Sequence, residues 1–185
     1  MNRIWIRLCA MALVASVVAV DTFATQVIQR SPKELAQLSQ LVVDGTVQSV
    51  RSYWNDDRSK IFTEAVIRVE ATHKGTAAQS VRVVQPGGVV GNVRMTAHGA
   101  LQWKQGEQVL LFLEPATPGA FQVAGFTQGK YLIERDPQTG KSFVKHAMPP
   151  DAADSKSPAA DANSTARATE KITLEQFLDS VLPNE

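Results

Sequence analysis

Short runs of β-branched and apolar residues, separated by turns rich in glycine and proline, recur along most of this 185-residue chain. The clearest run extends from Ile61 to Thr72, where residues 61, 63, 65, 67, 69 and 71 alternate with the polar residues 64, 68, 70 and 72. A period of two residues is the signature of a strand that buries one face. Repetition of such runs predicts a mainly β fold.

Further strands are predicted on both sides of this run. The stretch from Leu41 to Ser52 changes register at Gly45, where we expect a β-bulge that bends a long strand. The stretch from Val109 to Leu113 is apolar throughout, so that strand should be buried on both faces. The remaining predicted strands are Val81–Gln85, an irregular one at Val89–Thr96, Phe121–Gly125, Lys130–Arg135 and Lys141–Lys145.

Two capping motifs predict one helix near each end of the folded region. Ser31-Pro32-Lys33-Glu34 combines a capping serine, a proline at the first helical position and a glutamate three residues after the serine. Thr173 to Gln176 repeats the capping-box pattern ahead of an amphipathic stretch of about ten residues. A helix this short is marginal alone, so it should dock on the barrel or on another protein.

The first 24 residues have the layout of a secretory signal peptide. Arg3 and Arg7 give a basic start, an apolar stretch runs from Leu8 to Val20, and Ala24 supplies a small residue for cleavage. This apolar stretch is shorter than the ~20 residues that span a bilayer, so we expect cleavage after Ala24 and not a membrane anchor. The protein is therefore expected in the periplasm or the extracellular space.

Charge and cysteine content restrict the partners of the exported chain. Loss of residues 1–24 would remove Cys9, the single cysteine, so no disulfide could stabilise the remaining domain. The formal net charge would fall from +1 to zero. Binders of nucleic acid or anionic membranes usually carry a large basic excess. We therefore expect no nucleic-acid partner and no stable membrane insertion after cleavage.

The composition changes between Pro149 and Thr169, where small and polar residues replace all large apolar ones. Such a segment cannot bury enough surface to offset its ordering entropy, so a disordered linker is predicted. The expected organisation is a signal peptide at 1–24, an OB-like β-barrel with its N-terminal helix at 25–148, the linker at 149–170 and a C-terminal helix at 171–185.

Five sequence blocks resemble the netrin-like module and the tissue inhibitors of metalloproteinases: VVDGTV, IFTEAVIRVEATHKG, VRVVQPGG, KQGEQVLLFL and FQVAGFTQGKYLI. They are also similar to a group of exported bacterial proteins. The resemblance covers roughly Leu41 to Ile133 and implies a small OB-like barrel. Those inhibitors chelate zinc through an N-terminal cysteine and carry disulfides, whereas a chain that starts near Thr25 has no cysteine. The resemblance thus implies the fold and not that mechanism.

Residues that could carry chemistry do not cluster in the sequence. His73, His98 and His146 have no metal-ligand spacing. The stretch from Gln85 to Gly91 is rich in glycine but lacks the motifs of phosphate and dinucleotide loops. No nucleophile elbow is present either. We therefore expect no enzymatic activity, no metal and no cofactor.

The expected function is an exported, non-enzymatic domain that binds another protein, with an exported protease as one candidate partner. The alternative is an OB-like domain that binds an oligosaccharide or another extended ligand. An apolar loop patch would favour the protein partner, and several exposed aromatic residues on one face would favour the alternative.

Loops on a rigid barrel are the usual place for binding residues, and large aromatic residues are frequent anchors. The candidates are therefore the aromatic pair Tyr53-Trp54 in a polar loop, the glycine loop with Gly87-Gly88, and a polar rim with Gln128 and Lys130. The aromatic pair could also be a lid on the barrel, and the glycines a plain strand-ending loop. The candidate binding residues are Tyr53, Trp54, Gly87, Gly88, Gln128 and Lys130.

Overall fold

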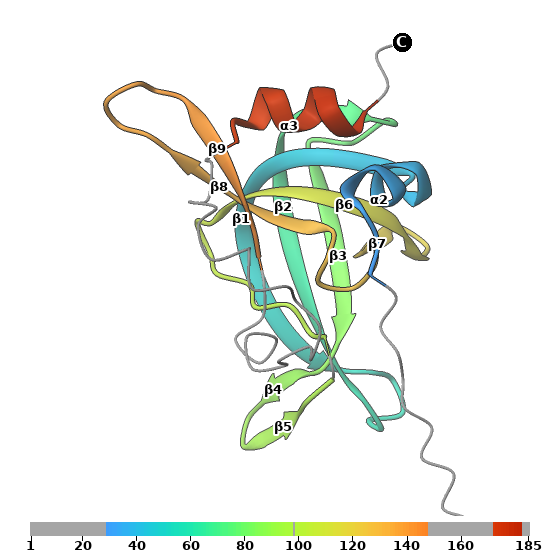
Figure 1. Cartoon of the computed structure of the whole chain (residues 1–185). Coiled ribbons are helices and arrows are strands. Elements are labelled where there is room, and N and C mark those ends of the chain that lie inside the picture. Colours follow the sequence, from blue (N-terminus) through green and yellow to red (C-terminus); the bar gives the residue numbers. More distant parts are fainter. Residues whose placement is uncertain (1–28, 98, 148–171, 183–185) are drawn as a thin grey trace, which may run out of the picture.

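The computed structural model describes residues 29–97, 99–147 and 172–182 (Figure 1). The predicted signal peptide and linker lie outside the described residues. The fold is mainly β, with one short helix before the strands, α2 (Pro32–Leu38), and one after them, α3 (Leu174–Val181). The predicted fold class is therefore confirmed.

Seven strands form the main sheet, in the order β1-β2-β3-β7-β6-β8-β9, and a separate hairpin pairs β4 with β5. Each predicted strand corresponds to an observed one, except that the stretch Val89–Thr96 folds as the two-stranded hairpin. The strands are β1 (Leu41–Trp54), β2 (Ile61–Lys74), β3 (Ser80–Pro86), β4 (Gly88–Val90), β5 (Val93–Met95), β6 (Gln108–Thr117), β7 (Ala120–Val123), β8 (Lys130–Arg135) and β9 (Ser142–His146).

The main sheet curls back on itself because β1 also pairs with β6, through residues 41–46 against 108–113. The cycle β1-β2-β3-β7-β6 is then closed by the parallel pairing of β3 with β7, which consists of the single pair Val83–Phe121. Beyond this pair β3 ends in Pro86, which has no N–H to offer a neighbouring strand. The result is a partly open barrel whose weakest closure is this β3–β7 seam.

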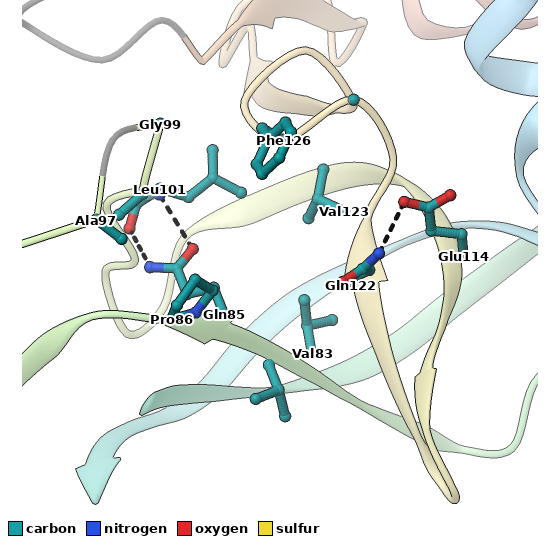
Figure 2. Close-up of a pocket in the computed structure, with 13 residues that line it drawn as sticks. Val83, Gln85, Pro86, Ala97, Gly99, Leu101, Glu114, Gln122, Val123 and Phe126 are labelled. Atoms are coloured by element: carbon teal, nitrogen blue, oxygen red, sulfur yellow. Dashed lines mark hydrogen bonds between the residues drawn. The ribbon is translucent and has the colours of Figure 1, made fainter. Parts of the chain in front are cut away.

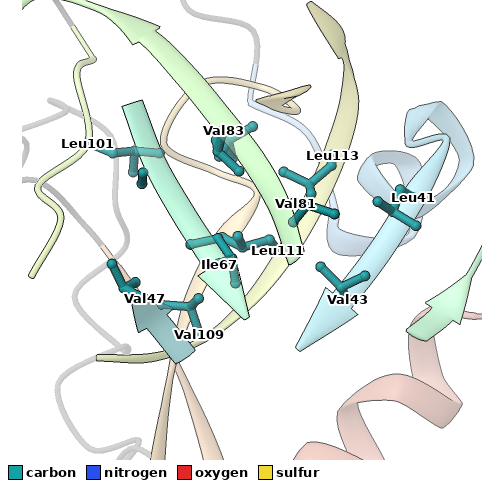
Figure 3. Close-up of a cluster of buried hydrophobic side chains, with 12 residues drawn as sticks. Leu41, Val43, Val47, Ile67, Val81, Val83, Leu101, Val109, Leu111 and Leu113 are labelled. Carbon is teal, nitrogen blue, oxygen red and sulfur yellow. The ribbon is translucent and has the colours of Figure 1, made fainter. Parts of the chain in front are cut away.

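Strand β6 is buried on both faces, as its continuous apolar sequence predicts, because the protein has two cores. Val109, Leu111 and Leu113 point into the barrel and belong to its inner core (Figure 3). Leu110 and Phe112 point outward into a second core beneath the two helices. All five of these side chains are fully buried.

Helix α3 docks on the outside of the sheet and completes the second core. Phe177 and Val181 are its buried residues, and the Phe177 ring lies 4.8 Å from that of Tyr131 and 6.4 Å from that of Phe112. The predicted capping boxes are present at the start of both helices. The barrel itself therefore supplies the docking site that such a short helix needs.

Gly45 lies at the predicted bulge, since the register between β1 and β2 shifts between Asp44 and Gly45. A Cβ at this position would lie 2.1 Å from the carbonyl oxygen of Arg68, so the two backbones could not keep their spacing. We expect Gly45→Ala to lower the free energy of unfolding by about 2–3 kcal/mol, measured by urea denaturation. The exposed change Gln48→Ala on the same strand should leave stability nearly unchanged. Equal stability of the two variants would contradict this role of Gly45.

Candidate functional site

A cavity of about 140 Å³ opens at the β3–β7 seam, and we call it the seam pocket (Figure 2). It forms where the two strands separate beyond their single pair. Its lining comes from four parts of the chain: β3, β7 with β6, the residues Ala97 and Gly99–Leu101, and the turn after β7. The lining includes Val83, Val84, Gln85, Pro86, Ala100, Leu101, Glu114, Gln122, Val123 and Phe126.

The floor of the seam pocket is apolar because Val83, Leu101 and Val123 also belong to the inner core. Gln85 fixes one wall through two hydrogen bonds with the backbone of Leu101. Its side-chain Nε2 donates to the Leu101 carbonyl at 2.8 Å, and its Oε1 accepts from the Leu101 N–H at 3.0 Å (Figure 2). These two bonds hold the backbone of Leu101 against β3.

Phe126 stands at the rim of the seam pocket with 66% of its surface exposed. Its φ of +60° lies in the left-handed region that non-glycine residues rarely adopt, and Gly125 before it has a φ of +63°. This strained turn holds a large aromatic side chain in solvent beside an apolar cavity. Such a combination is typical of a surface that binds a partner.

A second exposed apolar feature is the β4–β5 hairpin, where Val89 and Val93 are each nearly half exposed. The hairpin is attached through Gly87 and Gly88. Gly87 is buried and has a φ of +92°, and a Cβ on Gly88 would lie 2.4 Å from the hydroxyl oxygens of Ser52 and Thr63. These two glycines thus let the hairpin backbone pack closely on the barrel.

The outer face of β1, β2 and β3 carries a charged cluster centred on Glu64, which is only 3% exposed. Arg51 Nε donates to Glu64 Oε1 at 2.9 Å, and Arg82 donates to Glu64 Oε2 through Nε at 2.8 Å and through Nη2. We call Arg51 and Arg82 the arginine pair. Sequence alternation predicts Glu64 on the polar face, and it does lie there, but the two arginines cover it.

The arginine pair decides the ionisation of Glu64. Burial raises the pKa of this carboxyl and is the largest single influence, but the hydrogen bonds and charges of Arg82 and Arg51 together outweigh it, so the pKa lies below its ordinary 4.5. A carboxyl with a lowered pKa stabilises the fold fully above its unfolded pKa and loses that contribution as the pH falls through the folded value. Glu64 is therefore a charged anchor for both arginines at neutral pH.

The predicted aromatic pair does not lie in a polar loop. Tyr53 and Trp54 end β1, in register with Phe62 and Ile61, because the hairpin pairing continues to the loop at residues 55–60. The Tyr53 ring stacks on Phe62 at 6.3 Å, and the Arg51 guanidinium lies 5.4 Å from the Tyr53 centroid. Both predicted residues are half-buried, so the loop placement was wrong.

Lys130 is not at a solvated rim as predicted, because its side chain enters the interior and is only 2% exposed. Its ammonium donates to Glu107 Oε2 at 2.6 Å and to the Gln102 carbonyl at 2.7 Å, and it lies 4.5 Å from the Trp103 ring centroid. Burial lowers the pKa of Lys130 more than Glu107 raises it. Lys130 thus fixes the loop at residues 102–107 and is unavailable to a partner.

Gln128 is half-buried in the turn next to the seam pocket. Its Nε2 donates to the Gly125 carbonyl at 3.3 Å, and its Oε1 accepts from the Arg30 N–H at 2.7 Å. It therefore links the turn that carries Phe126 to the segment before α2.

Phe126, Val84 and the arginine pair were not among the binding residues predicted from the sequence. The exposure of Phe126 could have been predicted, because the flanking residues Gly125 and Gly129 indicate a turn, where a core side chain is unexpected. No sequence pattern marks the arginine pair, since isolated arginines on strands are usually solvated. Their importance comes from Glu64, which the register of three strands places between them.

Two of the histidines have protein partners. His73 Nε2 lies 3.2 Å from Asp44 Oδ2, and His146 Nε2 lies 3.1 Å from the Gln128 carbonyl oxygen. His98 is outside the described residues. Within the ranges that the structure covers, no three His, Cys, Asp or Glu side chains converge as metal ligands. No helix in those ranges has the length and hydropathy to cross a membrane.

Comparison with known proteins finds no matching family model and no matching curated protein.

Proposed function

We propose that this chain is an exported, non-enzymatic protein-binding domain whose seam pocket takes one apolar side chain of a protein partner. The observation that carries the proposal is the cavity of about 140 Å³ with an apolar floor at the barrel's weakest closure. A cavity of about 150 Å³ lined by apolar residues holds a benzene molecule. The seam pocket is therefore large enough for the side chain of a leucine or a phenylalanine.

Three exposed apolar side chains support a protein partner over an oligosaccharide. Phe126 lies at the pocket rim, and Val89 and Val93 are exposed on the β4–β5 hairpin. An oligosaccharide site would need several exposed aromatic residues on one face, whereas Phe126 is the single exposed aromatic residue in the described part of the chain, and Tyr53 and Phe62 stack on each other and are half-buried. The netrin-like resemblance makes an exported protease one candidate partner.

Filling the seam pocket tests the proposal. Ala100 lines the pocket and is half-buried, so the ring of Ala100→Phe should occupy the space that a partner side chain needs. Peptides selected from a random displayed library by the wild-type protein should share one large apolar residue. Their affinity for Ala100→Phe should fall about tenfold or more, the loss typical of a blocked anchor site, measured by fluorescence anisotropy.

The matched control is Ala78→Phe, which adds the same ring at an exposed position in the loop between β2 and β3. This variant should bind the selected peptides as the wild type does. Thermal unfolding of both variants checks that they fold. Equal peptide affinity of wild type and a folded Ala100→Phe would overturn the proposed function.

A further inference from the structure

We propose that the partner segment carries an acidic side chain two positions from its apolar anchor, and that the arginine pair on the outer face of the barrel binds this carboxylate. The inference rests on the proposed function, because it assumes that the anchor occupies the seam pocket. It adds the chemistry of the partner: an extended acidic peptide.

The arginine pair keeps donors for a ligand after its contacts with Glu64 are made. Arg51 contacts Glu64 through Nε only, and Arg82 contacts it through Nε and Nη2. The other N–H groups of these guanidiniums have no acceptor in the part of the chain that the structure describes. The side chains are 67% and 49% exposed, so their free edges face solvent.

The cluster has an uncompensated positive charge. Two guanidiniums share one carboxylate, so the three side chains together carry one positive charge at neutral pH. A ligand carboxylate bound to the pair would complete the neutralisation, and arginine binds carboxylates through parallel N–H groups. The charge of the site thus matches one acidic side chain.

The guanidiniums are also held in place before any ligand arrives. The nearly buried Glu64 fixes one edge of each, and the ring of Tyr53, stacked on Phe62, lies beneath Arg51. An arginine that is already oriented loses less side-chain entropy when it binds. This separates the arginine pair from a solvated arginine such as Arg68, which contacts only the half-exposed Glu70.

The arginine pair and the seam pocket share strand β3. Val84 and Pro86 line the pocket, and they are the register partners of Glu64 and Phe62 on β2. Arg82 lies two residues before Val84 on the same face, a separation of about 7 Å along a strand. In an extended peptide, every second side chain points to the same face, and these side chains are also about 7 Å apart. An anchor in the pocket therefore places the residue two positions away near Arg82.

A single net charge beside an apolar cavity favours an acidic peptide over a sulfated polysaccharide. Polyanion binders distribute many basic residues over one surface. Here the chain without its first 24 residues has a formal net charge of zero, and Glu64 cancels half of the charge of the arginine pair.

Binding of short peptides to residues 25–185 of the chain tests the inference. Acetylated, amidated Gly-Phe-Gly-Asp-Gly and Gly-Asp-Gly-Phe-Gly are compared with their asparagine counterparts by NMR titration at low and high salt. At least one aspartate peptide should bind about threefold to fivefold more tightly than its counterpart at low salt, and salt should reduce the difference. The double variant Arg51→Gln/Arg82→Gln should bind the aspartate and asparagine peptides equally. The control Arg68→Gln should keep the preference for the aspartate peptide.

Glu64→Gln separates ligand binding from a purely structural role. This change raises the net charge of the three side chains from +1 to +2, so binding of the aspartate peptide by a folded variant should depend more steeply on salt than binding by the wild type does. An unchanged salt dependence in a folded Glu64→Gln variant would overturn the role of the arginine pair.

The outcomes separate the two proposals. Asparagine and aspartate peptides that bind equally, in a way that Ala100→Phe abolishes, would overturn the acidic-partner inference and leave the seam pocket supported. Peptide binding that Ala100→Phe does not change would overturn the proposed function. A sulfated hexasaccharide is the comparison ligand. If it shifts the NMR signals of the arginine pair more strongly than any acidic peptide does, the ligand is a polyanion and the inference is overturned. Failure of all four peptides to bind would overturn both.

Discussion

Replacing Lys130 with alanine is expected to lower the free energy of unfolding by about 3–5 kcal/mol, the usual cost of removing one partner from a buried ion pair. The change would leave the Glu107 carboxylate and the Gln102 carbonyl without the ammonium that both contact. It would also take the cation from the face of Trp103 and open a cavity under the loop. Urea denaturation followed by tryptophan fluorescence measures the loss.

Lys104→Ala provides the control, since Lys104 lies in the same loop with its side chain exposed. It should change stability by less than about 0.5 kcal/mol. The double variant Lys130→Met/Glu107→Leu removes both charges together and should be more stable than Lys130→Ala. A Lys130→Ala protein as stable as Lys104→Ala would show that the ion pair does not hold the loop.

Phe112→Ala should cost about 3–5 kcal/mol as well, the range for deleting a large buried ring. Phe112 is fully buried, and its ring contacts those of Tyr131 at 5.8 Å and Phe177 at 6.4 Å. The variant would create a cavity at the point where α3 rests on β6. We therefore expect lower stability in urea together with faster amide hydrogen exchange in α3.

Phe126→Ala is the matched comparison, because it deletes the same ring from a largely exposed position with a positive φ. Its effect on stability should stay within about 0.5 kcal/mol. If Phe112→Ala destabilised the protein no more than Phe126→Ala, the second core would not be what holds α3 on the sheet.

Local patterns in the sequence were sufficient to predict most elements. The alternation in Ile61–Thr72, the apolar run at Val109–Leu113 and the two capping boxes lie where strands and helices were expected. The Gly45 bulge was also predicted, because a glycine that interrupts an alternating run usually marks a bulge. Each of these signals depends on residues close together in the chain.

Most of the candidate site could not be predicted from such local patterns. Tyr53 and Trp54 look like loop residues next to a polar stretch, but pairing with β2 extends β1 to include both. Lys130 looks like a solvated lysine, but Glu107 and Trp103 lie 23 and 27 positions away in the chain and meet it only in the folded barrel. Phe126 was readable from its glycine-flanked turn alone, although its position beside a cavity was not.

Alternation, turn residues and capping are local preferences of the backbone, so they were enough to establish the mainly β class, the strand positions and the helix starts. Where the barrel closes weakly, and which charges are covered, depends instead on which strands become neighbours and in what register. Strand β3 meets β7 at a single pair, and Glu64 lies between Arg51 and Arg82 only because β2 lies between β1 and β3. A period of two residues tells which face a side chain occupies, but not what lies opposite it across the sheet.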